Sequence, residues 1–269
     1  MRVLNLAAAC AALAVPVIFA NTAAAQAPAQ PTSGPVASAP QVPQTASPAA
    51  EPEYSLNKLG PIAISYNIGI ANDYAFRGVS QTNQHDSLFA GIDASYKDFY
   101  AGVWQSNVNF KPFGDFDTSH EIDLYGGWKP TFMTVALDIG GIYYAYSNQP
   151  TYLPNVDYFE GYIKGTKTFG PVTVGGSFYY SPDFTGETGN AEYYEANVAW
   201  AFDKKLTFSG AVGRQEIEKS TGDYTTWNVG ATYALIDHVS IDLRYWDTDE
   251  HGFGKVYGDR IIAGLKFTY

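Results

Sequence analysis

Apolar and polar residues alternate with a period of two along most of the chain, most clearly at its end. One face of the segment 259–269 is continuously apolar, with Ile261, Ala263, Leu265, Phe267 and Tyr269. The other face carries Arg260, Gly264, Lys266 and Thr268, and Ile262 is its one apolar residue. A period of two predicts a β-strand. Because one face suits lipid and the other suits a wet lumen, the pattern favours a transmembrane barrel strand over the edge strand of a soluble sheet.

The alternation recurs in about twelve segments of the length that crosses an outer membrane. We expect strands at residues 62–73, 88–96, 100–108, 121–128, 134–146, 158–168, 172–180, 193–202, 206–215, 226–235, 239–246 and 260–269. Joining two neighbouring segments would leave about ten strands, and single-chain barrels have an even number in either case.

The connections between these segments alternate between short and long. Short turns are expected at residues 97–98, 129–130, 169–171, 203–204 and 236–238. Longer polar loops are expected at residues 79–86, 111–119, 148–156, 182–191, 217–222 and 247–258. An up-and-down barrel with short periplasmic turns and longer outward loops has this order, whereas a Greek-key sandwich or a jelly roll does not. The sequence therefore predicts an all-β fold, a single up-and-down antiparallel transmembrane β-barrel with a disordered N-terminal leader.

The first part of the chain does not alternate, and it divides into two segments. Residues 1–25 combine Arg2, an apolar run and a small-residue site at Ala23–Ala25, which predicts a secretory signal peptide, with an uncleaved anchor as the alternative. Residues 26–58 are rich in Ala and Pro and predict a disordered periplasmic leader. Its reach would allow contact with the cell wall, and a spacer without a partner is the alternative. The barrel is expected over residues 59–269.

Composition and charge narrow the class of protein. The net charge of −11 argues against nucleic acid as a partner. The mean hydropathy of −0.16 is that of a soluble protein, but barrel strands dilute each lipid-facing residue with a polar neighbour. The 21 Tyr, 16 Phe and 5 Trp fit aromatic girdles at the membrane interfaces, and they also fit a soluble carbohydrate-binding domain. Cys10, the single cysteine, lies in the predicted signal peptide, so no disulfide or thiolate metal site is expected in the barrel.

The same alternation predicts which charged side chains line the lumen. Eight acids fall on the inward face: Asp73, Asp93, Glu121, Asp123, Asp138, Glu160, Glu195 and Asp242. Five bases join them: Arg77, Lys164, Arg244, Arg260 and Lys266. An open lumen with this balance would mildly prefer cations or neutral solutes, whereas charges interlocked across the lumen would pass only water or small ions. Asp73 and Arg77 are expected on one face of the first strand, where we favour a bracing role over a selectivity ring.

Two segments also resemble a known family. Residues 72–82 (NDYAFRGVSQT) and 100–108 (YAGVWQSNV) are similar to the TorF-type porins of proteobacteria. This resemblance covers about residues 62–269 and implies an outer-membrane barrel whose substrate is poorly defined, without catalytic residues. Gly264, Phe267 and Tyr269 resemble the C-terminal assembly signal of bacterial outer-membrane barrels, which implies the barrel assembly machinery as a partner. Ile262 departs from that pattern, which has a polar residue at its place.

The candidate functions differ in what the residues must do. A channel for small solutes or ions in the outer membrane of a Gram-negative bacterium, surrounded by lipid and lipopolysaccharide, fits the charged lumen best. A closed structural or adhesion barrel that acts through its outward loops is the alternative. A lipid-modifying enzyme is less favoured, because none of the four histidines is expected on the lipid face beside a serine. We therefore expect no catalytic residue, cofactor or metal, and we regard Asp115, Asp117 and Glu121 as a solvated loop in preference to a Ca²⁺ site.

Overall fold

The computed structural model describes residues 58–59, 61–111, 118–149, 154–220 and 222–269. The predicted signal peptide, and all of the predicted leader except Lys58, lie outside the described residues. Among the residues described, no helix is long and apolar enough to cross a membrane.

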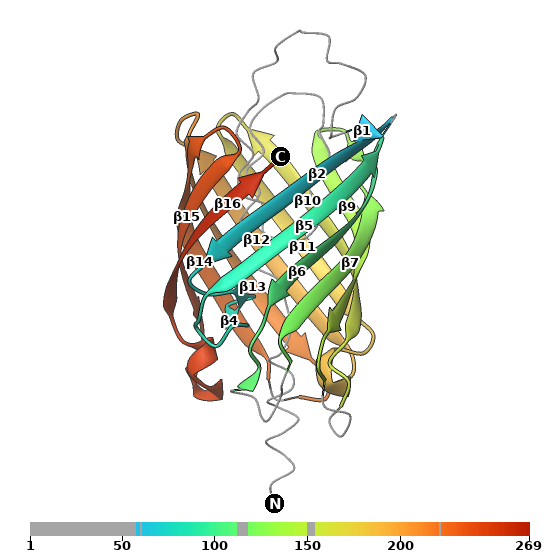
Figure 1. Ribbon diagram of the computed structural model, residues 1–269, viewed down its shortest axis with the longest axis vertical. Coiled ribbons are helices and arrows are strands. Elements are labelled where there is room, and N and C mark those ends of the chain that lie inside the picture. The colour runs from blue at the N-terminus through green and yellow to red at the C-terminus, as the bar shows by residue number, and fades with distance from the viewer. Residues whose placement is uncertain (1–57, 60, 112–117, 150–153, 221) are drawn as a thin grey trace, which may run out of the picture.

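Twelve long strands form one closed antiparallel barrel, as the alternation predicts (Figure 1). They are β2 (Ile62–Ala71), β5 (Ser87–Tyr96), β6 (Phe99–Asn107), β7 (His120–Trp128), β9 (Val135–Tyr146), β10 (Tyr158–Phe169), β11 (Val172–Ser181), β12 (Ala191–Ala201), β13 (Leu206–Ile217), β14 (Tyr224–Ile236), β15 (Val239–Thr248) and β16 (Arg260–Thr268). Each long strand pairs with the next one along the chain, and β16 pairs with β2 to close the ring. Closure leaves no free sheet edge in the wall.

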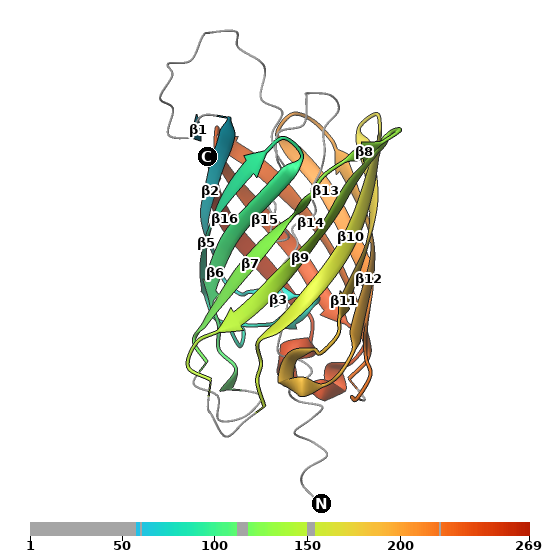
Figure 2. The same ribbon diagram turned by 90° about the vertical axis from the view of Figure 1, so that its right-hand side faces the viewer.

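Four short strands and three 3₁₀-helices complete the described structure. β1 (Lys58–Leu59) pairs with β2, and β8 (Thr131–Phe132) pairs with β9. β3 (Ala75–Phe76) and β4 (Val79–Ser80) pair only with each other. The helices are η2 (Thr185–Glu187), η3 (His251–Phe253) and η4 (Lys255–Tyr257), which lie in the longer loops. The short turns and the C-terminus share one end of the barrel, and the longer loops share the other (Figures 1 and 2).

The outer surface of the wall is an apolar belt. Along each strand exposed apolar residues alternate with buried or half-buried ones, as in β15, where Ile241 and Leu243 are exposed and Asp242 and Arg244 are buried. Aromatic side chains gather at the short-turn end, where the rings of Phe99 and Trp128 stack with centroids 6.4 Å apart. Such a belt with an aromatic rim matches the lipid-facing surface of an outer-membrane barrel.

The seam between β2 and β16 is the shortest ladder among the twelve long strands, pairing Asn67–Ala71 with Gly264–Thr268. The side chain of Asn72 extends it, because its Nδ2 donates to the Ile261 carbonyl at 3.2 Å while its Oδ1 accepts from the Ala263 amide at 2.8 Å. At the other end Tyr66 and Tyr269 exchange two backbone hydrogen bonds of 3.0 and 2.9 Å, and their rings stack at 5.3 Å. The side chain of Asn72 therefore extends the short ladder at one end. The contact between Tyr66 and Tyr269, which we call the terminal clasp, extends it at the other.

The structure corrects one part of the predicted topology. β2 ends at Ala71, so Asp73 and Arg77 do not lie on the first strand, and the predicted outward loop 79–86 is wrong over its first half, residues 79–82. Residues 73–82, which we call the inward hairpin, are all buried and contain β3 and β4. The chain reverses at Arg77 (φ 44°) and Gly78 (φ 83°), and a turn with two positive φ values is the type that suits a tight hairpin. A side chain at residue 78 would collide with Thr226, whose Oγ1 lies 2.2 Å from the Cβ position.

The two faces of the wall give a direct test of the register. Val198 and Leu243 face outward and are 46% and 55% exposed, whereas Asn197 and Ser240 lie on the inward face beside them. Arginine at Val198 or Leu243 is expected to lower the free energy of unfolding by about 2–4 kcal/mol, because it places a charge in lipid. Arginine at Asn197 or Ser240 is expected to cost much less. Urea unfolding in lipid bilayers measures the difference, and greater damage from the inward pair would contradict the register.

Candidate functional site in the barrel interior

The structure places all thirteen predicted lumen residues inside the barrel, on the wall or on the inward hairpin. Nine of them are buried: Asp73, Arg77, Asp93, Glu121, Asp123, Glu160, Asp242, Arg244 and Lys266. The other four are half-buried: Asp138, Lys164, Glu195 and Arg260. The interior of the described barrel is therefore strongly polar, and its contacts decide which charges are satisfied and which are not.

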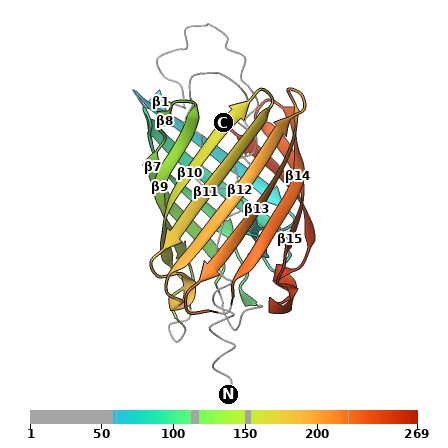
Figure 3. The same cartoon turned by 180° about the vertical axis from the view of Figure 1, so that it is seen from behind.

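Arg77 anchors the tip of the inward hairpin to the far wall of the barrel. Its guanidinium donates to Glu160 of β10 at 2.9 Å and to Gln215 of β13 at 2.6 Å. It also lies 4.1 Å from the ring centroid of Tyr193 on β12, a cation–π contact. These strands form the wall seen from behind in Figure 3. A buried arginine held by charge-assisted bonds to two strands fixes the hairpin tip in position across the lumen.

Asp73 holds the base of the same hairpin through different partners. It accepts hydrogen bonds from Ser80 Oγ at 2.6 Å and from Thr82 Oγ1 at 2.8 Å, which tie the two arms of the hairpin together. Its other oxygen lies 3.7 Å from Arg260 Nε on β16. Asp73 and Arg77 do not pair with each other in these contacts. Each fastens the hairpin at a separate place.

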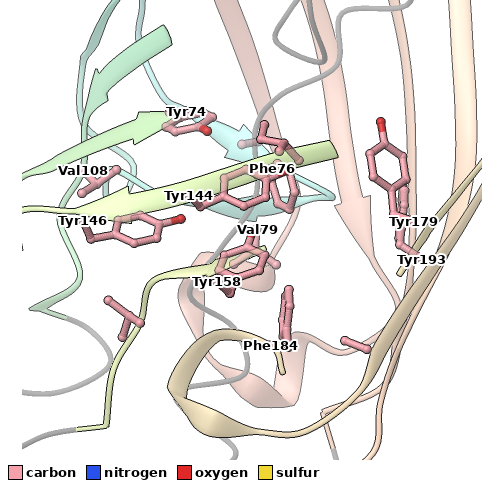
Figure 4. Packing of buried hydrophobic residues seen from close by; sticks show 14 of the residues in the cluster. Tyr74, Phe76, Val79, Val108, Tyr144, Tyr146, Tyr158, Tyr179, Phe184 and Tyr193 are labelled. Atoms are coloured by element: carbon pink, nitrogen blue, oxygen red, sulfur yellow. The ribbon is translucent and has the colours of Figure 1, made fainter. Parts of the chain in front are cut away.

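Aromatic packing fills the space between the hairpin and the wall at the long-loop end of the barrel. Tyr74, Phe76 and Val79 of the hairpin lie among Tyr144, Tyr158 and Phe184 (Figure 4). The ring of Phe76 meets Tyr144 edge-on at 6.4 Å, and Tyr144 stacks on Tyr158 at 4.4 Å. The inward hairpin and these rings therefore form a small hydrophobic core within the polar interior of the barrel.

Paired charges and tyrosines form the rest of the interior. Arg244 donates to Asp242 at 3.0 Å, to Asn228 at 2.7 Å and to Ser209 at 2.9 Å. Lys164 Nζ lies 3.8 Å from Asp138, which also accepts from Tyr100 at 2.7 Å. These contacts link neighbouring strands through their inward side chains and stiffen the wall from within.

Glu121 and Asp123 differ from the other inward acids that the structure describes. Both are on β7, both have no exposed surface, and neither forms an ion pair with any described residue. Glu121 Oε1 accepts one hydrogen bond, from Tyr74 of the hairpin at 2.7 Å. Glu121 Oε2 and both carboxylate oxygens of Asp123 have no hydrogen-bond partner. Two acidic side chains therefore lie beneath the inward hairpin without a counter-charge among the described residues.

The sequence analysis missed the tyrosines of the lumen, because it assigned aromatic residues to the membrane interfaces. Tyr125, Tyr144, Tyr162 and Tyr193 are buried inside the barrel and share the inward phase of the neighbouring acids. The alternation therefore contained the signal that places them.

The sequence analysis also missed Lys129, which follows β7 at the short-turn end. Its Nζ lies 4.0 Å from the ring centroid of Tyr100, and burial lowers the pKa of Lys129 to about 8.

The histidines bear on the expectation about catalysis. His120 faces outward on β7, and its Nδ1 lies 3.0 Å from Ser119 Oγ, so the expectation that no histidine lies there beside a serine is wrong. Asn148 donates to the serine at 3.0 Å and not to the histidine, so within the described residues no third group orients the imidazole as a catalytic base requires. Near η3, His251 Nε2 lies 2.6 Å from Asp247, and this hydrogen bond raises the pKa of His251.

The structure also bears on metal binding. No group of three or more His, Cys, Asp and Glu is placed to hold a metal ion in the described part of the chain. Asp115 and Asp117, which the sequence analysis weighed together with Glu121 as a Ca²⁺ site, lie outside the described residues.

Comparison with known proteins decides the family. The model of a family described as "Bacterial protein of unknown function (Gcw_chp)" matches residues 56–261, which is most of the chain. The chain belongs to the Gcw_chp family. The match spans the described strands from β1 to the start of β16, so the matched region contains the residues of the inward hairpin as well as most of the barrel wall. No curated protein matches this Gcw_chp chain.

Solved structures show which known barrels the Gcw_chp chain is similar to. The KdgM porin in complex with disordered oligogalacturonate is 11% identical, with a TM-score of 0.54, over 77% of this chain and 98% of that chain. The NanC porin is 10% identical over 77% and 98%, with a TM-score of 0.49. Outer membrane phospholipase A from Escherichia coli is 13% identical over 76% and 95%, with a TM-score of 0.44. The likeness to the KdgM porin shows the fold alone, a β-barrel like that of a bacterial porin.

Proposed function

We propose that this Gcw_chp protein is an outer-membrane channel of the TorF porin type for small solutes or ions. The observation that carries the proposal is the contrast between the two faces of the wall. The outer face is an apolar belt, whereas the inner face and the inward hairpin carry thirteen predicted charged residues that are all buried or half-buried. Part of this charge braces the wall and anchors the hairpin, and together with the other inward polar groups it would provide a polar path for a solute.

The balance of inward charge sets the proposed selectivity. Eight of the thirteen side chains are acids and five are bases. A negative excess inside a low-dielectric wall attracts cations more strongly than the same charges do in bulk water. The KdgM porin was solved with oligogalacturonate, which is a polyanion. We propose that the present channel favours small cations or neutral solutes over such a polyanion.

The inward hairpin supplies the proposed constriction. It enters from the long-loop end, and Arg77 fixes its tip on β10 and β13. A solute must pass between this hairpin and the wall, so the hairpin limits size while the acids beside it select charge. The ion pair between Arg77 and Glu160 lies within the narrow part and sets its shape.

Ion selectivity in planar bilayers tests the proposal. Cations are expected to carry more of the current than anions, and the excess is expected to shrink as the Debye length falls from ~10 Å at 0.1 M to ~3 Å at 1 M salt. Replacing Glu121, Asp123 and Asp138 with their amides is expected to reduce or reverse the preference. The reversal potential under a salt gradient, measured for the parent and the triple amide variant, reports the change.

The matched control is Asp237→Asn, which removes one acid from an exposed short turn. This variant is expected to keep the parent's reversal potential. Anion selectivity in the parent would contradict the proposed role of the inward acids. The absence of any current, together with no uptake of small sugars in liposome swelling, would contradict the channel itself.

A closed barrel that acts through its outward loops is the second candidate, and one observation favours it. Every residue from Asp73 to Thr82 is buried, so the inward hairpin fills much of the long-loop end. In such a barrel the hairpin would act as a plug, and function would lie in the loops that include η2, η3 and η4. Conductance separates the two candidates, because a plugged barrel passes no ions.

The proposed surroundings follow from the same features. We place the protein in the outer membrane of a Gram-negative bacterium, with lipid and lipopolysaccharide around the apolar belt and with the leader in the periplasm, where it is able to reach the cell wall. The C-terminal residues Gly264, Phe267 and Tyr269 are the proposed signal for the barrel assembly machinery. We assign no catalytic residue, cofactor, metal or nucleic-acid partner.

A further inference from the structure

The acids of the barrel interior divide into those with a positively charged partner and those without one. Glu160 pairs with Arg77, Asp138 with Lys164, and Asp242 with Arg244. Glu121, Asp123 and Glu195 form no ion pair with any residue that the structure describes. Glu195 is half-buried and accepts hydrogen bonds from Tyr193 and Asn197, whereas Glu121 and Asp123 are fully buried. Burying a carboxylate without a counter-charge is costly. The barrel therefore holds two carboxylates in a place where a bound cation would compensate them.

The side chains around the two acids are aromatic. In the register of the sheet Asp123 lies between Trp104 of β6 and Tyr144 of β9, all three on the inward face. Glu121 lies beside Tyr146 of β9, which is more than nine-tenths buried and whose hydroxyl interacts with the Glu121 carboxylate. Side chains directly across a strand pair approach to about 5 Å. The two carboxylates are therefore bordered by aromatic rings.

The inward hairpin covers this group. Tyr74 of the hairpin donates its hydroxyl to Glu121 Oε1 at 2.7 Å, and its ring meets Trp104 edge-on at 5.5 Å. Figure 4 shows Tyr74, Tyr144 and Tyr146 gathered at this level of the barrel. Carboxylates, ring faces and free oxygen acceptors together form the chemistry that recognises an organic ammonium group, since the rings attract its charge and the oxygens accept its N–H bonds.

We infer that Glu121 and Asp123 bind the primary ammonium group of a small organic cation beneath the inward hairpin. The inference rests on the proposed function, because it names the solute class for which the channel is selective. Asp123 has both carboxylate oxygens free and receives the ammonium group, while the Glu121 carboxylate accepts another of its hydrogens. Two acids are fewer oxygen ligands than Ca²⁺ takes, and the aromatic border favours an organic cation over a metal ion.

The site is coupled to the hairpin through Tyr74. An ammonium group that donates hydrogen bonds to Glu121 draws on the same carboxylate that accepts from the Tyr74 hydroxyl, and this hydroxyl holds that side of the hairpin to β7. Binding of the ammonium group therefore favours release of the hairpin from β7, and release of the hairpin favours binding of the ammonium group. A solute of this class would open its own path, whereas an inorganic cation without N–H donors would not.

Calorimetric titration of the full chain in detergent micelles tests the inference. The probes are n-propylammonium chloride and, at equal ionic strength, NaCl, tetramethylammonium chloride and CaCl₂. Propylammonium is expected to bind saturably, and the variant Glu121→Gln/Asp123→Asn is expected to bind it at least about tenfold more weakly. Asp237→Asn is expected to bind as the parent does. Equal binding of Na⁺, Ca²⁺ or tetramethylammonium, undiminished binding by the double amide, or no saturable heat in the parent would overturn the assignment.

Stability supplies a second measurement. The double amide removes two uncompensated charges, so its urea midpoint is expected to rise above that of the parent, whereas Glu160→Gln leaves Arg77 unpaired and is expected to lower it. If the double amide does not fold, Asp123→Asn alone serves, because Asp123 has no hydrogen bond to lose. A midpoint that falls in both amide variants would show the acids to be structural and would overturn the inference. Binding without conductance would refute the channel alone, and conductance without binding would refute this site alone.

Discussion

Replacing Arg77 with alanine is expected to convert a narrow or closed barrel into a wider pore. The guanidinium is the group that joins the hairpin tip to β10 and β13, and its removal leaves Glu160 as an unpaired buried carboxylate. Removing one partner of a buried ion pair costs about 3–5 kcal/mol, which is enough to displace a short hairpin from its docked position. Single-channel conductance in planar bilayers is expected to rise, and the urea midpoint is expected to fall.

Arg214→Ala is the matched control for this prediction. Arg214 lies on β13, one of the strands that Arg77 contacts, but its side chain is 41% exposed, and its ion pairs with Glu216, Asp223 and Asp249 are 3.7–4.0 Å long. Exposed pairs contribute about 0–1 kcal/mol, so this variant is expected to retain the parent's conductance. The double variant Arg77→Ala/Glu160→Gln is expected to recover part of the urea midpoint, but its single-channel conductance is expected to stay above that of the parent. Unchanged conductance in Arg77→Ala would contradict the role of the hairpin as the constriction.

Loss of the terminal aromatic residues is expected to prevent assembly. Tyr269 exchanges two backbone hydrogen bonds with Tyr66, at about 1 kcal/mol each, and the stacked rings add about 1 kcal/mol. His238 also packs on Tyr269 and Phe267, with ring centroids 5.1 and 6.1 Å apart. Deletion of Tyr269 combined with Phe267→Asp removes this clasp from the shortest ladder. Cell fractionation is expected to show periplasmic accumulation and degradation in place of a heat-modifiable barrel.

Phe202→Asp controls for the loss of an aromatic residue at the same end of the barrel. Phe202 is exposed and packs on Trp200 and Phe208, away from the seam. This variant is expected to reach the membrane, because the ladder between β2 and β16 is intact. Normal levels of a folded barrel with the terminal clasp removed would show that Phe267 and Tyr269 do not act as an assembly signal.

The barrel wall was predictable because successive side chains of a strand point to opposite faces of the sheet. A side chain of β15 or β16 faces lipid or lumen according to its parity, so alternation and turn length gave the twelve strands and the order of the connections. Ile262 illustrates the rule: it broke the apolar pattern of the last strand, and it lies inside at 1% exposure, as its parity requires.

The inward hairpin was not predictable in this way. Asp73 and Arg77 continue the inward parity of β2, so the pattern extended the strand by several residues. What ends the strand is a set of distant partners: Glu160 lies 83 residues from Arg77 along the chain, and Gln215 lies 138 residues away. No local pattern contains those contacts. The same limit applies to Glu121 and Asp123, whose parity was evident but whose lack of a counter-charge depends on where Arg77 and Arg260 lie.

The anchoring of the inward hairpin also determines when it docks during folding. The hairpin comes early in the sequence, but its acceptors on β10 and β13 come much later. Until those strands have joined the sheet, Arg77 has no partner on the far wall, and contacts between distant residues form slowly. Docking of the hairpin is therefore expected only after β10 and β13 have joined the sheet, and a docked hairpin would mark a barrel whose far wall is already in place.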